Sequence, residues 1–426
     1  MLGDILKPIT MLKEITINSW RQYENVNIKL HPRITILTGA NGAGKTTILN
    51  IINQHFGWQN LLVGTAKQDK KTGNLIYLSG IWNKIKNTFS SSSNIYSHFQ
   101  NHQEIGTITY SNNIKTRILI PDVVHTQYDL IIENQQHLNG FNIPSHRPIY
   151  KYQNVPNIRT SVITKRQAFE QYRSSQVQRY FGSYSDKTET YYIKETLISL
   201  AALGYGNQIV SPNQASIKIY EEFIEILKTV LPPKLGFKSL SVRIPEVILE
   251  TESGDFSIDA VSGGIASIID LAWQIFMFDE SDNRFIVCFD EPENHLHPEM
   301  QKTLIPNFLK AFPNVQFIVA SHNPFIISSV NDSYVYALTY NENNKVYSQI
   351  LDNIEKSGTA NEILRQVLGI ESTTPEWVDN KLDEIIKKYS NEGVTPENIE
   401  KLKGELTEIG LENYISESVI KFITKK

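Results

Sequence analysis

Short stretches of alternating or clustered hydrophobic residues dominate the first part of the chain, at residues 13–20, 25–30 and 33–39. Alternation with a period of two is typical of a strand with one buried face, and a short apolar cluster is typical of a fully buried strand. Residues 106–120 alternate on both sides of residues 111–113, where asparagine tolerates the positive φ of a hairpin turn. The first part of the sequence is therefore predicted to be rich in β-strands.

Helical spacing takes over after residue 165. In the clearest helix, residues 219–231, six apolar residues share one face: Tyr220, Phe223, Ile224, Leu227, Val230 and Leu231. Residues 238–261 return to a strand pattern with a turn at 252–255. A predicted helix over 267–279 is then followed by a buried strand, a helix and a second buried strand. This order predicts a parallel sheet with helices covering both of its faces.

The last part of the sequence, residues 371–426, has the pattern of a small helical module. Thr374-Pro375 and Thr395-Pro396 each resemble a helix N-cap followed by a first-turn proline. Two apolar faces follow these caps: Trp377, Leu382, Ile385, Ile386 and Tyr389 on one helix, and Ile399, Leu402, Leu406 and Ile409 on the next, which ends at Gly410. These faces exceed what so short a module easily buries, so they predict docking of a partner, with packing onto the rest of the chain as the alternative.

The sequence "ITILTGANGAGKTTIL" at residues 34–49 places a glycine-rich loop between a strand and a helix. Its residues 39–46 match the phosphate-binding pattern G-x-x-x-x-G-K-[ST] without exception. Glycines let the backbone turn around phosphates, and the helix start adds the positive end of its dipole. Lys45 is expected to reach the β- and γ-phosphates and Thr46 to bind Mg²⁺. The residues assigned to the nucleotide here are Gly39, Asn41, Gly42, Ala43, Gly44, Lys45, Thr46 and Thr47.

Two further buried strands end in polar residues suited to nucleotide hydrolysis. The sequence "RFIVCFDEPENHLHP" places Asp290 and Glu291 after the first strand, and "QFIVASHNPF" places His322 after the second. Asp290 is expected to hold Mg²⁺, directly or through water, and Glu291 to orient and deprotonate the attacking water. His322 is expected to contact the γ-phosphate and sense its loss. The alternative is that these are surface carboxylates and a structural histidine.

A second candidate anion site lies where Ser262, Gly263 and Gly264 lead into a predicted helix. Ser-Gly-Gly is also common in ordinary turns, so this segment indicates an anion site only in combination with the other three motifs.

The composition of the chain restricts which classes of protein it can belong to, but it identifies no catalytic residue. The chain has 426 residues, a net charge of −4 and one cysteine, Cys288, so no internal disulfide is expected. We see no signal-peptide pattern and no apolar run of membrane-spanning length, so a cytoplasmic protein without a membrane partner is predicted. Residues 147–194 contain nine Lys or Arg and three acids, with interleaved tyrosines. This composition is typical of a nucleic-acid surface, and equally of a solvated helical face.

The motifs "GANGAGKT", "VSGG", "DEP" and "SH", in this order, resemble those of ABC-type ATPases. The opening "LKEITINSWRQYENVNIKLHPRITILTGANGAGKTT" is similar to the SMC, RecF and OLD-like branch, over residues 11–50 and 238–330. The resemblance implies an α/β ABC-type P-loop ATPase head with an antiparallel β subdomain, a helical insertion and a C-terminal helical module. The implied boundaries are residues 1–140 and 238–345 for the two lobes of the head, 141–237 for the basic, largely helical insertion, and 346–426 for the C-terminal module.

The resemblance also implies how the motifs work. Two heads sandwich ATP, so Ser262, Gly263 and Gly264 of one copy cap the γ-phosphate held by the other, and residues 293–297 cross the dimer interface. Arg21 would border the nucleotide, and Gln153 is assigned as the family's glutamine at the Mg²⁺ site. The signature departs from the family pattern at Val261 and Ile265.

The sequence resembles compact ATPases of bacterial anti-phage systems such as the Septu type. Residues 165–231 hold only short helices rather than SMC-type arms, and no Asp-x-Asp nuclease motif follows His322. This resemblance implies an ATP- and Mg²⁺-dependent ATPase that forms a homodimer or higher oligomer and regulates a separate effector, a nuclease. The alternatives are a DNA-repair or chromosome-maintenance ATPase acting on DNA, and a slow-hydrolysing, nucleotide-gated scaffold.

Overall fold

The computed structural model describes residues 10–58, 60–68, 73–80, 102–121, 123–147, 151–279, 283–370, 373–390 and 393–424. The chain divides into two compact units, residues 1–363 and 364–426. Among the described residues, no helix is both long and apolar enough to cross a membrane.

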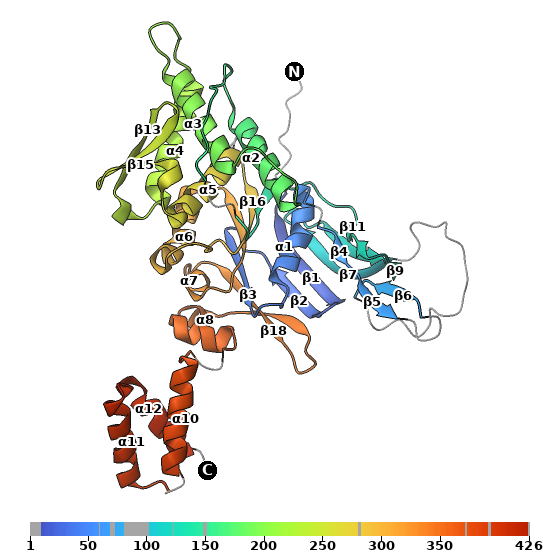
Figure 1. The fold of residues 1–426 in the computed structure, drawn as a ribbon. Helices are drawn as coiled ribbons and strands as arrows, with labels where there is room; N and C mark the ends of the chain where they lie inside the picture. The colour runs from blue at the N-terminus through green and yellow to red at the C-terminus, as the bar shows by residue number, and fades with distance from the viewer. Residues whose placement is uncertain are drawn as a thin grey trace, which may run out of the picture. The chain divides into compact units, whose positions relative to one another are not determined.

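The first unit is built on an 11-stranded sheet whose order is β11-β8-β7-β1-β2-β19-β18-β3-β17-β16-β12. Strands β18, β3, β17, β16 and β12 run parallel to one another, whereas β1, β2, β7, β8 and β11 form an antiparallel half (Figure 1). The strands of this sheet are β1 (Leu12–Trp20), β2 (Tyr23–Lys29), β3 (Ile34–Gly39), β7 (His102–Tyr110), β8 (Lys115–Pro121), β11 (Ile131–Ile132), β12 (Gly140–Ile143), β16 (Phe285–Asp290), β17 (Val315–Ala320), β18 (Tyr334–Tyr340) and β19 (Val346–Ile350). The fold is therefore α/β, with the predicted parallel core and antiparallel subdomain joined in one sheet.

Three smaller sheets surround it. Their strands are β4 (Leu62–Val63), β5 (Thr65–Gln68), β6 (Leu75–Leu78), β9 (Val123–Val124), β10 (Gln127–Tyr128), β13 (Phe237–Arg243), β14 (Glu246–Thr251) and β15 (Asp255–Ser257). The predicted hairpin is confirmed as β7–β8, and Asn113 at its turn has a φ of 63°.

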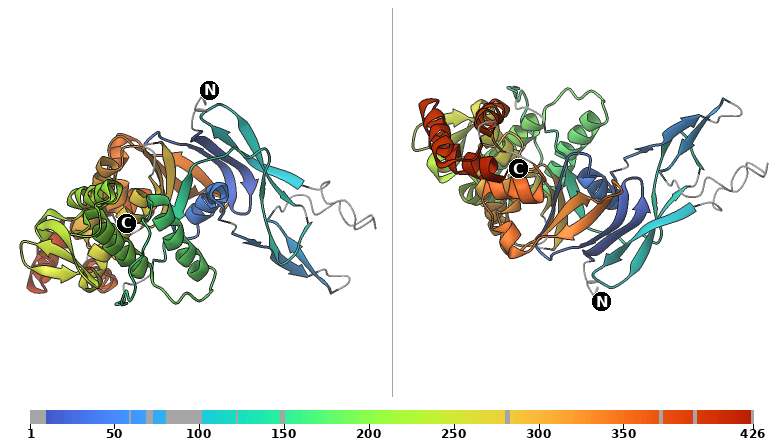
Figure 2. Two further views of the ribbon diagram at one scale, coloured as in Figure 1. Left: turned by 90° about the horizontal axis from the view of Figure 1, so that it is seen from above. Right: turned by 90° about the horizontal axis from the view of Figure 1, so that it is seen from below.

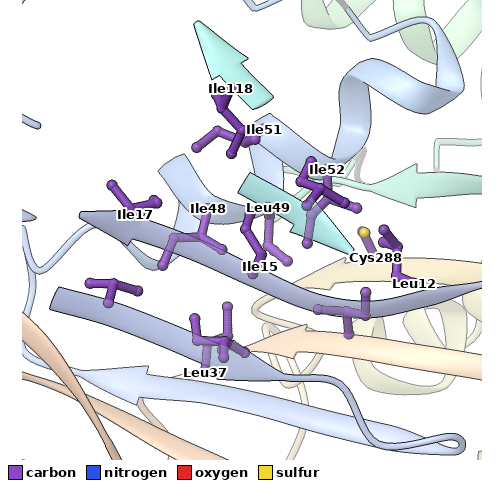
Figure 3. Close-up of a cluster of buried hydrophobic side chains, with 14 of the residues drawn as sticks. Leu12, Ile15, Ile17, Leu37, Ile48, Leu49, Ile51, Ile52, Ile118 and Cys288 are labelled. Carbon is purple, nitrogen blue, oxygen red and sulfur yellow. The ribbon is translucent and has the colours of Figure 1, made fainter. Parts of the chain in front are cut away.

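Helix α1 (Lys45–Asn53) contributes to the core shared by the two halves of the sheet. Its apolar side chains Ile48, Leu49, Ile51 and Ile52 are fully buried and belong to one cluster with residues of both halves. Figure 3 shows them facing Ile15 and Ile17 of β1, Ile118 of β8 and Cys288 of β16. This packing fixes the start of α1, and with it the loop that precedes Lys45.

The helices of the insertion pack at the parallel end of the sheet, beside β16 (Figures 1 and 2). They are α2 (Lys165–Tyr180), α3 (Glu189–Tyr205) and α4 (Gln214–Val230). Helices α2 and α4 contact α5 (Gly263–Phe278), α4 also contacts α6 (Pro298–Ala311), and α3 packs against α2 and α4. The predicted face of α4 is confirmed, because all six of its apolar residues are buried. Short helices α7 (Pro324–Ile327), α8 (Asn353–Lys356) and α9 (Ala360–Glu362) complete the unit. The boundary predicted at residue 346 falls at the start of β19, within the main sheet.

The second unit contains helices α10 (Glu376–Ser390), α11 (Pro396–Glu408) and α12 (Ile415–Thr424). Leu382, Ile385 and Ile386 of α10 pack with Leu402 and Leu406 of α11 in a core of their own. Apart from Trp377 and Ile409, which is 42% exposed, the two predicted faces therefore bury one another together with Phe422 of α12, contrary to the expectation that they exceed the module's own core. Trp377, assigned to the first face, is instead 66% exposed.

Candidate nucleotide-binding site

The loop between β3 and α1 can be built only with glycine at two of its positions. Gly39 has a φ of 132°, and a Cβ added there would lie 2.4 Å from the carbonyl oxygen of Leu338 on the neighbouring strand β18. Gly44 has a φ of 96°, and its Cβ would lie 2.0 Å from the hydroxyl of Tyr23. The close approach of β18 and of Tyr23 thus enforces the tight turn that phosphate binding requires.

Lys45 lies inside this loop rather than in solvent. Its ammonium donates to the carbonyl oxygens of Gly39 at 2.9 Å and of Ala40 at 3.1 Å. Burial lowers the pKa of Lys45, and the carboxylates of Glu291 and Asp290 act in the opposite direction. A phosphate at this position could replace the carbonyls as the partner of the ammonium, since charge-assisted hydrogen bonds are the stronger ones.

The loop and the end of β16 meet at Thr46 and Asp290. The hydroxyl of Thr46 donates to the Asp290 carboxylate, with 3.0 Å between Oγ1 and Oδ2. Strand β17 lies between β3 and β16, so all three carboxyl ends share one edge of the sheet. Burial raises the pKa of Asp290 and the hydrogen bond from Thr46 lowers it. A hydroxyl and a carboxylate at this edge are the hard oxygen donors that fit Mg²⁺.

Glu291 and His322 also meet at this edge. Oε1 of Glu291 lies 3.3 Å from Nδ1 of His322, and Oε2 accepts a hydrogen bond from the amide of Asn294 at 3.1 Å. The side chains of Glu291 and His322 are 31% and 50% exposed, so solvent water can reach both. The two residues predicted for catalysis are thus in contact, because β16 and β17 are neighbouring parallel strands and each residue follows the end of its strand.

Two residues at the turn between β1 and β2 contact the loop and were missed in the sequence. The Tyr23 hydroxyl donates to the carbonyl oxygen of Gly44 at 2.7 Å, and the Gln22 amide reaches that of Gly42 at 3.5 Å. Tyr23 is fully buried, and burial raises its pKa far above the usual range. Its position in an alternating strand pattern gave no sign of this role, because the contact depends on the pairing of distant strands.

In the part of the chain that the structure describes, the side-chain hydrogen bonds of Arg21 and Gln153 go to residues outside the phosphate loop and outside the predicted Mg²⁺ site. The guanidinium of Arg21 lies over the ring of Trp20 and donates to the carbonyl oxygen of Val63 and the hydroxyl of Tyr128. The Gln153 amide donates to the carbonyl of Asp186 and accepts from the backbone and hydroxyl of Thr188, at the start of α3. Within the described residues, Gln153 makes no hydrogen bond to Thr46 or Asp290, so its assignment to Mg²⁺ gains no support.

The signature serine stands at an open helix end. Ser262 is the N-cap of α5, is exposed, and makes no capping hydrogen bond with its side chain, while Gly263 is also exposed. Gly264 is buried under the loop after β16: a Cβ there would lie 3.2 Å from the carbonyl oxygen of His295. The first turn of α5 is therefore packed against this loop, and the serine at its start is exposed.

The basic stretch at 147–194 does not form one exposed surface. Lys194 is fully buried and pairs with Glu246 at 2.9 Å and with Asp259. Three arginines pair with glutamates of the insertion: Arg159 with Glu195, Arg166 with Glu170 and Arg179 with Glu189. Arg147 is also buried, and Arg173 donates to the carbonyl of Phe56. Because the fold buries Arg147 and Lys194 and pairs three further arginines with glutamates, composition alone does not define a nucleic-acid surface here.

The phosphate loop, the carboxylates after β16 and the histidine after β17 define a P-loop nucleotide-binding protein of the AAA/ABC type. Residues 115–328, half of the chain, match the family described as "AAA domain, putative AbiEii toxin, Type IV TA system", and the chain belongs to this family. Residues 14–201, which include the loop, match a second family described as "AAA domain".

Individual relatives are more distant. The chain is 20% identical to the Septu protein PtuA of Bacillus thuringiensis over 90% of both chains. It is 25% identical to the Retron Ec83 probable ATPase of Escherichia coli, over 37% of this chain and 29% of that protein. Among solved structures, the Smc head domain derived from Pyrococcus furiosus is 15% identical with a TM-score of 0.43, covering 81% of this chain and 97% of that one.

Proposed function

We propose that this protein binds ATP and hydrolyses it in a reaction that depends on Mg²⁺. The observation that carries the proposal is the meeting of five side chains at one sheet edge: Lys45 in its loop, Thr46 on Asp290, and Glu291 beside His322. A P-loop with a carboxylate pair at the end of a nearby parallel strand is the arrangement of nucleotide-hydrolysing proteins. Membership of an AAA-domain family supports the same activity.

Each residue has a distinct task in this proposal. The amides of the loop and the ammonium of Lys45 hold the β- and γ-phosphates, and Thr46 with Asp290 would hold Mg²⁺. The bound ion would supply neutralisation of charge on the phosphate oxygens. Glu291 accepts a proton from the attacking water, and His322 contacts the γ-phosphate. The contacts of Glu291 with Asn294 and His322 keep its carboxylate in place before substrate arrives.

We further propose that two copies share each ATP. The support is the state of Ser262: an exposed helix start whose hydroxyl makes no capping bond is free to meet an anion from outside its own chain. In such a dimer the γ-phosphate held by Lys45 of one copy would be capped by Ser262, Gly263 and Gly264 of the other.

We propose that the ATPase regulates a separately encoded effector, a nuclease, in anti-phage defence. The match to a Septu protein runs along 90% of both chains, and a retron ATPase matches part of the chain. The sequence itself offers no second set of catalytic motifs to carry the output. ATP hydrolysis alone moves domains, so the effect on phage requires another protein.

Two measurements test these proposals separately. Purified protein should release phosphate from ATP only when Mg²⁺ is present, and Lys45→Ala should abolish this release. The native operon should protect cells in a phage challenge, and lose protection when Lys45→Ala is introduced. Turnover without protection would refute the defence role alone, whereas nucleotide binding without any turnover would refute the ATPase assignment.

A further inference from the structure

The loop that carries the catalytic carboxylate has an unfavourable backbone. Glu291 and His295 have φ values of 47° and 69°, in the left-handed region that residues other than glycine rarely adopt. Such conformations cost of order 1–3 kcal/mol each and persist only where surrounding contacts enforce them. The position of Glu291 therefore depends on whatever holds residues 291–295.

Arg147 makes three of these contacts with one nitrogen, and others come from the backbone of Ala320 and the hydroxyl of Ser321. Its Nη2 donates to three carbonyl oxygens of the loop, those of Glu291 at 3.0 Å, Pro292 at 3.1 Å and Asn294 at 3.3 Å. The arginine follows β12, the parallel neighbour of β16, so strand pairing brings it beside the end of β16. The preceding Ser145 also accepts a hydrogen bond from the amide of Asn294 at 3.3 Å.

Burying the charge of Arg147 costs free energy of folding unless that charge and its hydrogen-bond donors are paired. Its residue exposure is 9%, and its Nε and Nη1 atoms have no hydrogen-bond partner within the described residues. The loss of hydration lowers the pKa of Arg147, and the carboxylates of Asp270 and Glu293 act to raise it. A buried cation with unsatisfied donors is a poor choice for stability alone.

A second layer ties this arginine to other elements. Asp270 on α5 is fully buried, accepts from the hydroxyl of Tyr172 on α2, and accepts from the amide of Gln274 at 3.0 Å. Among the carboxylates that act to raise the pKa of Arg147, that of Asp270 has the largest effect. Asp270 therefore joins α5 to the insertion helix α2 through the hydrogen bond from Tyr172, and its charge acts on the arginine that contacts the catalytic loop.

We infer that Arg147 is a positioning residue for ATP hydrolysis, which holds Glu291 over the nucleotide by fixing the carbonyls of residues 291–294. The inference rests on the proposed ATPase activity. It predicts an effect on turnover rather than on nucleotide affinity, because the hydrogen bonds of Arg147 within the described part of the chain go to the backbone of residues 291–294 and not to the phosphate-binding residues.

The test compares Arg147→Met with a matched control, Arg33→Met. The Arg33 guanidinium also donates to backbone carbonyls, those of Leu309, Phe312, Pro313 and Val315, but at the opposite end of the sheet. Both changes remove a partly or fully buried cation and its carbonyl contacts. Arg147→Met should lower kcat by roughly 10- to 100-fold with KM for ATP changed less than about threefold, as expected for a misplaced catalytic group. Arg33→Met should lower the melting temperature and leave kcat unchanged.

Arg147→Lys provides the rescue measurement. A lysine at this position keeps the charge and can donate to at least one of the carbonyls, so kcat should lie between those of wild type and Arg147→Met. An Arg147→Met protein with wild-type kcat, or one that loses nucleotide affinity instead of kcat, would overturn the inference. If Arg147→Met does not fold, a wild-type kcat in an Arg147→Lys protein whose amides at residues 291–296 exchange faster than in wild type would overturn it.

Hydrogen exchange separates this inference from the proposed function. Amides of residues 291–296 should exchange faster in Arg147→Met than in wild type or Arg33→Met, whether or not ATP is hydrolysed. If wild type has no ATPase activity but shows this pattern, the proposed function fails and the role of Arg147 in holding the loop stands. Equal exchange in all three proteins would refute the positioning role directly.

Discussion

Replacing Glu291 with glutamine changes the chemistry of the site while preserving its shape. The carboxylate has two contacts, the amide of Asn294 at 3.1 Å and Nδ1 of His322 at 3.3 Å. The glutamine oxygen can still accept from Asn294, and its NH₂ group can face His322 if Nδ1 carries no proton. At most one hydrogen bond is lost, which costs about 1 kcal/mol. The fold and the phosphate loop should therefore survive the change.

Turnover should suffer much more. Loss of a general base lowers rates by roughly 10²–10⁴, which corresponds to a barrier higher by about 2.7–5.4 kcal/mol. The predicted barrier change exceeds the predicted stability change severalfold. The variant should thus bind ATP as wild type does and hydrolyse it at a small fraction of the wild-type rate.

The assay measures phosphate release in a single turnover, together with binding of a fluorescent ATP analogue and gel filtration with Mg-ATP. Because uncleaved ATP stays bound, the variant should elute as a larger species with ATP than without it. Hydrolysis within about threefold of the wild-type rate would refute the general-base assignment. Loss of nucleotide binding would show instead that the substitution disturbs the loop.

Three further changes test the surrounding structure. Gly44→Ala should abolish binding of the ATP analogue, because its Cβ would lie 2.0 Å from the Tyr23 hydroxyl. Burial raises the pKa of Asp270 to about 6, above its unfolded value of about 3.9. The charged form of this carboxyl therefore opposes folding, and the wild type should lose stability as the pH rises between these two values. The melting temperature of Asp270→Asn relative to wild type should therefore rise from pH 4 to pH 7, by the equivalent of about 3 kcal/mol at most, and a constant difference would contradict this reasoning. Arg173→Glu should lower the melting temperature by removing the contact with the Phe56 carbonyl, and should leave the salt dependence of any DNA binding unchanged; a flatter salt dependence would restore the nucleic-acid interpretation.

Features set by local pattern were predictable from the sequence. The loop at 39–46 depends on glycine and on the change from strand to helix, both visible in a few residues. The face of α4 follows from helical spacing alone, and Thr395 caps α11 as expected, accepting from the backbone of Asn398. Asp290 could be matched with Thr46 because parallel strands end at one edge of a sheet.

Features set by the packing of distant segments were not predictable. Gln153 was chosen by residue type, but its amide is used at the start of α3. Arg147 and Lys194 were counted as surface charge in the sequence. In the structure Arg147 is buried beside backbone carbonyls and Lys194 beside carboxylates. The tail is a further example. Its sequence showed two apolar faces, but only the structure shows that α10 and α11 pack against each other, with Phe422 of α12 in the same core.

The central claim is that ATP is hydrolysed at a site shared by two copies, and mixing two inactive variants tests it most directly. Lys45→Ala lacks the phosphate contact, and Ser262→Arg blocks the open end of α5. Each variant alone should release no phosphate from Mg-ATP. In a mixture, a dimer of one copy of each retains one intact site, formed by Lys45 of the Ser262 variant and Ser262 of the Lys45 variant. The account predicts that the mixture regains phosphate release; a mixture that stays inactive, or a Ser262→Arg protein as active as wild type, would contradict it.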